Sequence, residues 1–286
     1  MPTGPAQSGT DRPAVPRENR SIVADLHVHT TASDGTLTLS EIPSAAERAG
    51  LEWVAVTDHD RIHPRLPEPV VEREGISIVR GIELRVDAGD ERFDLLGYGV
   101  KETDALVRET ELLQRDRRER GRRIIDRVQS RLDVRLDIEP RPGIGRPHIA
   151  QAIADSPAPY DYADAFADLI GADGPCYVPR QVTSLDRGID LLSESCAVVA
   201  LAHPFRYGDV DAALELAREL DAVERWYPYG FDVDPSRIDR LLERGGLDLL
   251  ATGGTDAHDR TLGVAGLTQS AFEPVRRAIL DHASVT

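Results

Sequence analysis

The sequence predicts an α/β protein whose parallel strands form either a closed barrel or an open sheet. Short apolar runs recur along the chain, most of them end in a polar or ionisable residue, and helix signals lie between them. Strands that alternate with helices in this way form parallel sheets, and their functional groups sit at the carboxyl ends of the strands. The seven runs span residues 22–29, 53–59, 76–83, 93–99, 197–203, 222–227 and 249–256.

Two pairs of consecutive runs enclose clear helix signals. Thr38 and Glu41 stand at capping-box spacing after the first run, and Gly50 follows as a helix stop, which predicts a strand, helix, strand unit. After the sixth run, the Asp234-Pro235 pair reads as an N-cap followed by proline at the first helical position. This second helix is expected to stop at the paired glycines of residues 245–246.

A segment from about 103 to 194 interrupts this rhythm and predicts an inserted, mainly helical subdomain. Its first part, 104–132, has apolar residues at helical spacing, and five prolines follow before a short helix candidate at 162–170. The chain is therefore expected to comprise four parts in order. These are a flexible leader (1–20), a first barrel part (21–102), the helical insertion (103–194) and a second barrel part (195–286).

The composition excludes membrane-spanning and disordered classes of protein. Of 286 residues, 41% are hydrophobic and 29% are charged, and the longest apolar run, 197–202, is far below the roughly 18 residues that cross a bilayer. The first 20 residues lack the apolar segment of a secretory signal, and Cys176 and Cys196 are too few for a disulfide framework. We therefore expect a cytoplasmic protein with no membrane partner and no obligate protein partner.

The chain is strongly acidic, with 50 Asp and Glu residues against 34 Lys and Arg residues and a net charge of −16. The one lysine is Lys101, a bias that fits a GC-rich genome and adaptation to high salt equally well. The acidic excess repels polyanions at long range. One segment, 115–131, is locally basic with eight arginines and three acids, which indicates either a solvated helix face with ion pairs or a local site for phosphate groups.

Histidines and carboxylates gather at the ends of the predicted strands. His27 and His29 stand two apart on a strand, so their side chains share a face and can bind one ion. The ends of parallel strands meet at one mouth, and buried polar groups without partners are costly, so the convergence predicts a metal site. The remaining members are Asp34, His59, Glu83, His203, Asp256 and His258, with His148 from the insertion. His63 and His282 fit no such position and are expected on the surface.

The order of motifs around these residues resembles the PHP (polymerase and histidinol phosphatase) superfamily, and within it the TrpH-type metal-dependent phosphoesterases. The resemblance covers residues 22–267 and rests on DLHVHTTASDGTL, VTDHD, GIEL, LLGYGV, GRPHIA, YVPR, LAHPFRY and TGGTDAHD. It implies a distorted (β/α)7 barrel with an inserted, mainly helical subdomain, and a site for three divalent metal ions. One departure is Phe93-Asp94, where relatives often have a histidine, and it is expected to alter the rim and not the metals.

The resemblance also implies how the ligands divide among three ions. The first ion takes His27, His29, Glu83 and Asp256; the second shares Glu83 and adds His148 and His203; the third takes Asp34, His59 and His258. Mixed nitrogen and oxygen ligands suit Mn, Fe or Zn, and ligand type alone does not choose among them.

Charge favours phosphate chemistry at such a centre. Three divalent ions, three carboxylates and a bridging hydroxide leave a net charge of about +2, which matches a phosphate monoester dianion. The expected reaction is hydrolysis of nucleotide phosphate monoesters (nucleoside monophosphate or 3′,5′-bisphosphate) by attack of the metal-bridging hydroxide. Arg146 and Arg206 flank ligand-bearing segments and are candidates for binding the phosphate. Asp58, beside His59, is the candidate for orienting a ligand or the hydroxide.

Three other functions stay open at this point. The first is a 5′-to-3′ exoribonuclease acting on the 5′ end of short RNA, which the basic segment at 115–131 favours. An amidohydrolase also opens with His-x-His, but its bridging carboxylated lysine would have to be Lys101, a poorly placed candidate after the fourth run. A non-catalytic PHP module would tolerate missing ligands, and the complete set of nine argues against it.

Overall fold

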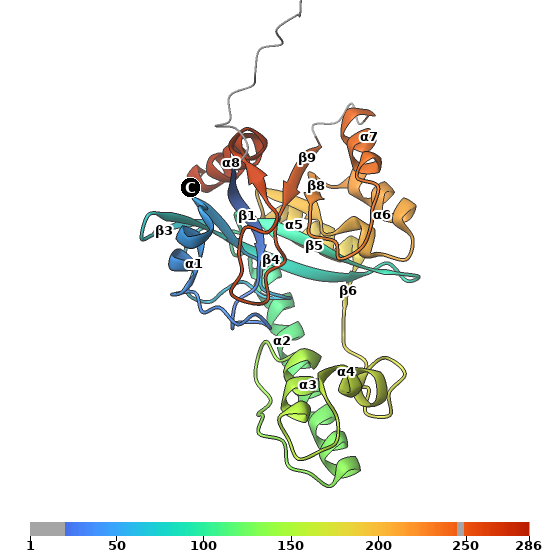
Figure 1. Cartoon of the computed structure of the whole chain (residues 1–286). Helices are drawn as coiled ribbons and strands as arrows, with labels where there is room; N and C mark the ends of the chain where they lie inside the picture. Colours follow the sequence, from blue (N-terminus) through green and yellow to red (C-terminus); the bar gives the residue numbers. More distant parts are fainter. Residues whose placement is uncertain (1–20, 245–248, 286) are drawn as a thin grey trace, which may run out of the picture.

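One ten-stranded sheet forms the body of the protein (Figure 1). The computed structural model describes residues 21–244 and 249–285. Its strands are β1 (Ile22–Val28), β2 (Trp53–Val56), β3 (Val70–Arg73), β4 (Ile76–Asp87), β5 (Arg92–Tyr98), β6 (Thr183–Ser184), β7 (Val198–Leu201), β8 (Ala222–Trp226), β9 (Leu250–Gly253) and β10 (Leu267–Thr268). The main path runs β10-β1-β2-β4-β5-β7-β8-β9, with β3 and β6 paired to β4. Each of the seven predicted apolar runs overlaps a strand of this path, which confirms the predicted α/β class.

The two ends of the sheet approach each other and nearly close a barrel. The His29 amide donates to the Ala257 carbonyl at 2.9 Å, and the Ala257 amide donates to the His27 carbonyl at 3.1 Å. These bonds join β1 to the segment that follows β9. The parallel pairs β1·β2, β2·β4, β7·β8 and β8·β9 make up most of the wall. The sheet is thus the distorted barrel that the sequence resemblance implies.

Strand β5 departs from the predicted parallel pattern, because it runs antiparallel to both β4 and β7. Only residues 88–91 connect β4 to β5, and within them the Ala88 amide donates to the Glu91 carbonyl at 2.9 Å. A connection this short permits only a hairpin, since a parallel crossover needs about a dozen residues. Glu83, which the sequence placed at a strand end, therefore lies inside a strand that continues to Asp87.

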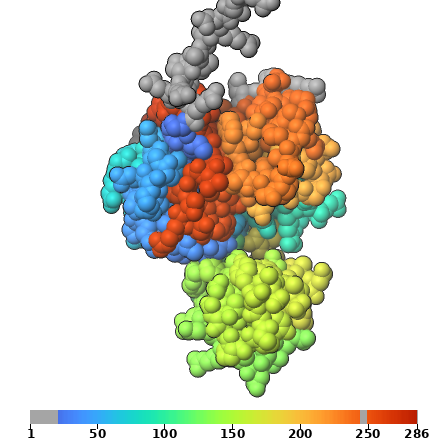
Figure 2. Space-filling view, in the orientation of Figure 1, coloured from blue at the N-terminus to red at the C-terminus, as the bar shows by residue number. Residues whose placement is uncertain are grey.

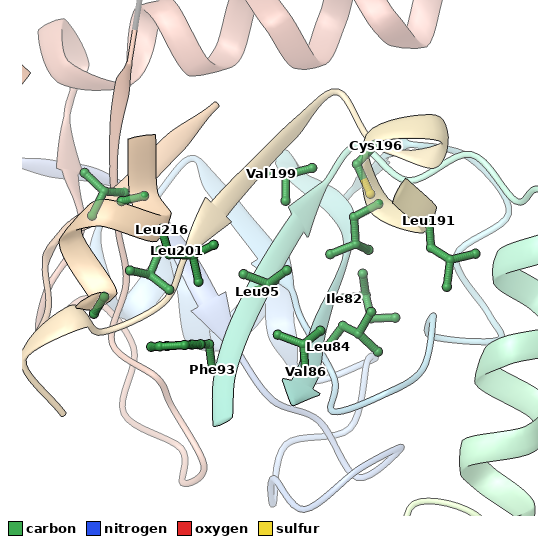
Figure 3. Close-up of a cluster of buried hydrophobic side chains, with 14 of the residues drawn as sticks. Ile82, Leu84, Val86, Phe93, Leu95, Leu191, Cys196, Val199, Leu201 and Leu216 are labelled. Atoms are coloured by element: carbon green, nitrogen blue, oxygen red, sulfur yellow. The ribbon is translucent and has the colours of Figure 1, made fainter. Parts of the chain in front are cut away.

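Alternation along β4 separates the hydrophobic core from the site. Ile82, Leu84 and Val86 are buried on one face, where they belong to the same cluster as Leu95 and Leu191 (Figure 3). Successive side chains of a strand point to opposite faces, so Glu83 and Arg85 are directed to the other side. The core thus holds β4 from behind while its polar residues face the interior of the barrel.

Helices cover the outside of the sheet (Figure 1). They are α1 (Ile42–Ala49), α5 (Leu185–Ser195), α6 (Val210–Leu216), α7 (Ser236–Arg244) and α8 (Gln269–Ser284), with 3₁₀ turns η3 (Pro204–Arg206) and η4 (Ala217–Glu219). Helix α1 begins later than the Thr38 spacing suggests, because Glu41 is the N-cap and its carboxylate accepts bonds from the Thr38 amide and hydroxyl. Gly50 ends α1 with a left-handed φ of 72°, as predicted. The predicted stop of the second helix, 245–246, lies outside the described residues.

The segment after β5 forms a lobe that projects from the barrel (Figures 1 and 2). Helix α2 (Asp104–Leu132) has the predicted bounds, and the short helix predicted at 162–170 consists of α4 (Tyr162–Asp164) and the π-helical η2 (Ala165–Ile170). Helix α3 (Arg146–Ala154) lies between them, and all pack around a core that includes Ile124, Ile149 and Leu169. Helix α5, although inside the range 103–194, packs into the core of the barrel.

Two further expectations concern the chain as a whole. The predicted leader, 1–20, lies outside the described residues. Among the described helices, none combines the length and the apolar character that a bilayer crossing requires.

Candidate metal centre

A cavity of about 790 Å³ opens where the strands end, and the predicted ligands line it. Its walls include Asp34, His59, Glu83, His203, Asp256 and His258. His27 and His29 lie beneath them at the end of β1, where both side chains are fully buried. The structure thus brings together eight of the nine residues that the sequence proposed as ligands.

Glu83 stands at the middle of this group, between imidazoles from three other strands or strand ends. Its Oε1 atom lies 3.5 Å from Nε2 of His27 and 3.3 Å from Nε2 of His203. Its Oε2 atom lies 3.4 Å from Nε2 of His29 and 2.6 Å from Nδ1 of His59. A carboxylate in this position can bridge two ions, which is the role that the resemblance assigns to Glu83.

Asp256 and Asp34 complete the group from loops. Oδ1 of Asp256 lies 3.2 Å from Nε2 of His29 and 3.4 Å from Nε2 of His27. Oδ1 of Asp34 lies 3.5 Å from Nε2 of His258, and Oδ2 of Asp34 lies 3.7 Å from Nε2 of His59. Three sets of donor atoms are close enough to hold an ion each: His27, His29 and Asp256; His29, Asp34, His59 and His258; Glu83, Asp94 and His203.

Orphaned polar atoms in this group test whether it fits metal ions. Nε2 of His27, both ring nitrogens of His29 and Oδ1 of Asp34 are buried without a hydrogen-bond partner in the described part of the chain. Such atoms are normally satisfied in a folded protein, because each one otherwise costs about 1–3 kcal/mol. Nitrogen and carboxylate oxygen donors are also the ligands that divalent transition metals bind. The donor set therefore fits divalent ions.

Imidazoles and carboxylates in this group shift the pKa values of one another. Burial lowers the pKa of the His59 imidazole, but the carboxylates of Glu83 and Asp34 outweigh burial and raise it to about 9. Burial likewise raises the pKa of Glu83, yet the neighbouring His59 and His27 hold it well below its usual range. Burial and the nearby His59 lower the pKa of His29. Burial also acts to raise the pKa of Asp34 and Asp256, but neighbouring imidazoles outweigh it and hold both pKa values below the usual range. All three carboxylates are therefore ionised at neutral pH.

Glu224 supports the group and was missed by the sequence analysis. It lies fully buried on β8, where Oε1 is 3.1 Å from Nδ1 of His27 and Oε2 accepts a hydrogen bond from the His203 amide at 2.7 Å. When a histidine binds a metal through one ring nitrogen, a carboxylate that accepts a hydrogen bond from the other ring nitrogen fixes the tautomer and makes the imidazole a stronger base. The available signal was an acidic residue, next to Arg225, inside the predicted strand run at 222–227.

Asp94 is the second residue whose place in the metal centre the sequence analysis missed. The departure at Phe93-Asp94 was expected at the rim, whereas Asp94 is 1% exposed and its Oδ2 lies 3.8 Å from Nε2 of His203. Arg85 binds it through two hydrogen bonds of 2.7 and 2.5 Å. A carboxylate at this position can bind an ion together with Glu83 and His203.

His148 is the proposed ligand that the structure does not bring into the group. Its Nδ1 accepts a hydrogen bond from the Gly145 amide at 3.1 Å, and its Nε2 lies 3.0 Å from a guanidinium nitrogen of Arg141. Both ring nitrogens are thus engaged at the start of α3. His148 belongs to none of the three donor sets found among the described residues.

The three other candidate residues take distinct places. The Asp58 carboxylate is fully buried and accepts hydrogen bonds from Thr30 and Ser33, so it braces the loop between His29 and Asp34. Arg206 lines the main cavity, where Nη1 lies 2.8 Å from the Tyr227 hydroxyl and 3.2 Å from Oδ2 of Asp256. Arg146 lies in the lobe and lines a second, adjoining cavity.

Two histidines and Lys101 complete the comparison with the sequence. His63 was wrongly expected on the surface: it is 4% exposed, and its Nδ1 accepts a hydrogen bond from the Arg65 amide because the loop after β2 folds over it. His282 is partly exposed on α8. The Lys101 amine donates to the His282 carbonyl at 2.6 Å and is therefore not a bridging group in the centre.

Comparison with known proteins adds to this geometry. Residues 25–227 match the PHP domain family. The chain is 27% identical over 198 residues to the 5′-3′ exoribonuclease Rnm of Escherichia coli strain K12, covering 66% of this chain and 68% of the relative. It is 29% identical over 256 residues to phosphoribosyl 1,2-cyclic phosphate 1,2-diphosphodiesterase of Eggerthella lenta, covering 84% and 95%. It is also 29% identical over 192 residues to the 3′,5′-nucleoside bisphosphate phosphatase of Chromobacterium violaceum, covering 64% and 67%.

A solved structure supports the fold. A protein from Bifidobacterium adolescentis, described as a metal-dependent phosphoesterase, superposes with a TM-score of 0.74 at 24% sequence identity. The match covers 91% of this chain and 98% of that one. The barrel and the lobe therefore form an architecture that the two chains share.

Proposed function

This chain belongs to the PHP domain family, and on that premise we propose that it is a metal-dependent phosphoesterase that hydrolyses phosphate monoesters of nucleotides. The substrates we propose are nucleoside monophosphates and 3′,5′-bisphosphates. The relatives named above act on phosphate esters, and one of them is a nucleoside bisphosphate phosphatase. The two cysteines, Cys176 and Cys196, are both free and buried, which is consistent with a reducing, cytoplasmic setting.

One observation carries the proposal. Nε2 of His27 and Nε2 of His29 lie 3.5 and 3.4 Å from the carboxylate of Glu83, and neither they nor a buried oxygen of Asp34 has a hydrogen-bond partner among the described residues. A merely structural cluster of this kind would pair these atoms with each other or with the backbone. Here several possible metal-ligand atoms are left unpaired and lie close together, which is the arrangement that a cation site requires.

We propose three divalent ions, of Mn, Fe or Zn, in three donor sets. The first set is His27, His29, Glu83 and Asp256; the second is Glu83, His203 and Asp94; the third is Asp34, His59 and His258. In the second set Asp94 takes the place that the sequence resemblance gave to His148, because its carboxylate lies beside His203 and the ring nitrogens of His148 are engaged elsewhere. Bound ions would supply positive charge to the phosphate oxygens and would lower the pKa of a water molecule for attack on phosphorus.

Other side chains of the protein orient the proposed ligands and face the space where the substrate would bind. Glu224 holds the His27 ring so that Nε2 faces the interior of the centre. The Tyr227 hydroxyl donates to Oδ2 of Asp256 at 2.8 Å, which leaves Oδ1 facing His27 and His29. Arg206 presents a half-exposed guanidinium group to the main cavity, where it can bind phosphate oxygens.

The test is to replace Glu83 by glutamine and His29 by alanine and to measure both metal content and turnover of AMP. Each change should abolish measurable turnover and lower the bound metal per chain, while circular dichroism shows an unchanged fold. Glu52→Gln is the matched control, because Glu52 is exposed and carries the same substitution away from the centre. Near-normal turnover by metal-quantified Glu83→Gln protein would refute the assignment.

A second candidate function, 5′-to-3′ exonuclease action on short RNA, has its own support. The Escherichia coli relative is an exoribonuclease, and the lobe gathers several arginines beside the centre. Contacts to several phosphates make binding fall steeply with salt, whereas a single phosphate does not. Rates on a 5′-phosphorylated oligoribonucleotide that fall steeply between 50 and 200 mM salt, with AMP rates nearly constant, would favour this function. Absence of any oligonucleotide turnover would exclude it.

A further inference from the structure

We propose that Asp25 is a positioning residue of the metal centre, which acts through Thr255 to hold the carboxylate of Asp256 in place as a ligand. This inference rests on the proposed function, in which Asp256 is a metal ligand, and adds to it the residue that enforces this role. Asp25 opens the DLHVHT motif on β1, and its side chain is fully buried. None of the three donor sets among the described residues includes it.

The Asp25 carboxylate ties one loop of the barrel to β1. Oδ1 accepts hydrogen bonds from the Thr255 amide at 2.9 Å and from the His27 amide at 3.3 Å. Oδ2 accepts hydrogen bonds from the Thr255 hydroxyl at 2.6 Å and from the Gly263 amide at 2.9 Å. Thr255 and Gly263 lie near the two ends of the loop 254–266, which joins β9 to β10 and is orange-red in Figure 1. A single buried carboxylate thus holds both limbs of this loop.

Asp256 follows Thr255 directly and has a backbone that needs such support. Its φ of 53° lies in the left-handed region. This conformation is unfavourable for residues other than glycine, and it persists only where the surrounding structure holds it. Asp25 holds the residue before Asp256, and two backbone hydrogen bonds to β1 hold the residue after it, Ala257. The strained residue is therefore fixed from both sides.

This fixation sets the distances from Asp256 to the neighbouring imidazoles. Oδ1 of Asp256 lies 3.2 Å from Nε2 of His29 and 3.4 Å from Nε2 of His27. Gly254 permits the close approach, because a Cβ atom at this position would lie 2.3 Å from the His27 amide nitrogen. The loop therefore packs directly on the backbone of β1, and the hydrogen bonds of Asp25 fix it there.

The arrangement requires a carboxylate and not an amide at position 25. Each oxygen of Asp25 faces a backbone N–H group, Oδ1 that of Thr255 and Oδ2 that of Gly263. An asparagine side chain has the same shape, but one of its two terminal groups is an NH2 donor. In either orientation, this NH2 group would face a backbone N–H. The Asp25→Asn substitution should therefore displace the loop, and Asp256 with it.

The experiment measures the affinity of Mn for the protein by competition with a chelator. Asp25→Asn should weaken Mn binding by about 10- to 100-fold, the usual effect of losing a residue that orients a metal ligand. Thr255→Val removes only the hydroxyl group and should weaken Mn binding by about tenfold, since it deletes one hydrogen bond to a charged group. Thr255→Ser keeps a hydroxyl group and should recover most of the affinity that Thr255→Val loses.

Asp221→Asn is the matched control for a role in stability alone. Oδ2 of Asp221 accepts a hydrogen bond from the Val199 amide at 2.9 Å, just before β8 and at the opposite end of that strand from Tyr227. Both substitutions thus replace a carboxylate that accepts a backbone hydrogen bond. Melting temperatures in EDTA report the stability of each metal-free variant. Only Asp25→Asn should change the affinity for Mn.

Each outcome decides for or against the positioning role. Unchanged Mn affinity in folded Asp25→Asn protein, or an equal loss of affinity in Asp221→Asn protein, would overturn it. If Asp25→Asn protein does not fold, the two Thr255 variants decide: weaker binding by Thr255→Val than by Thr255→Ser supports the role, and equal binding overturns it.

The same measurement separates this inference from the proposed function, because its readout is metal affinity and not turnover. A protein that binds Mn but does not hydrolyse AMP would contradict the proposed function, and the variants would still test Asp25. Absence of Mn binding by the unmodified protein would overturn both, because Asp256 would then have no ion to bind.

Discussion

Oε1 of Glu224 lies 3.1 Å from Nδ1 of His27, in a contact between β8 and β1 that joins residues 197 positions apart. The same carboxylate accepts a hydrogen bond from the His203 amide through its other oxygen. Glu224 therefore connects two ligand-bearing segments and sets the orientation of one imidazole. Because it does not face the proposed ions directly, its effect should appear in metal affinity before it appears in the fold.

Replacing Glu224 by glutamine should weaken metal binding by about 10- to 100-fold, because the neutral amide no longer stabilises the ligating tautomer of His27. Competition with a chelator of known affinity measures this effect. Glu219→Gln, an exposed substitution of the same kind, serves as the control. Unchanged affinity in Glu224→Gln protein would show that the contact is only structural.

Removing the ions should destabilise the protein. Ions that bind only the folded state add about 4 kcal/mol at a thousandfold excess over the dissociation constant. We therefore expect the melting temperature to fall by several degrees in a chelator and to recover when Mn is added back. Glu83→Gln protein should respond much less to the chelator. An identical melting temperature with and without the chelator in the unmodified protein would contradict a bound metal centre.

Replacing Asp94 by asparagine should remove one ion, because the second donor set then keeps only Glu83 and His203. Elemental analysis of the purified protein measures the number of ions per chain. Asp94→His should retain the ion, since imidazole is also a ligand for such metals. Asp90→Asn, at an exposed position in the wall of the same cavity, is the control. Full metal content in Asp94→Asn protein would remove Asp94 from the set of ligands.

Replacing Arg206 by glutamine should raise KM about tenfold for AMP and for the bisphosphate alike, because the guanidinium group lies in the main cavity. Arg187→Gln, an exposed arginine of α5, is the control. If instead metal affinity falls while KM is unchanged, Arg206 acts only by holding Asp256 and Tyr227.

Local patterns in the chain predicted the elements well. The seven apolar runs overlap seven of the ten strands, and helix α2 has the bounds that its apolar spacing indicated. These features depend on residues that are neighbours in sequence, where alternation, helical spacing and capping residues act directly. The antiparallel direction of β5 escaped the same reasoning, because the 88–91 turn is too short for the crossover that a parallel neighbour of β4 would need.

For the candidate site, too, local sequence predicts one part and tertiary structure determines the other. The sequence by itself determined the chemistry of the centre: imidazoles and carboxylates placed at or near strand ends can bind divalent ions. Only the tertiary structure decided which of them meet. It placed Asp94 beside His203 and left His148 with Arg141 and Gly145. Contacts of this kind depend on how distant strands and helices pack, and no short stretch of sequence encodes the distance between two segments that are far apart in the chain.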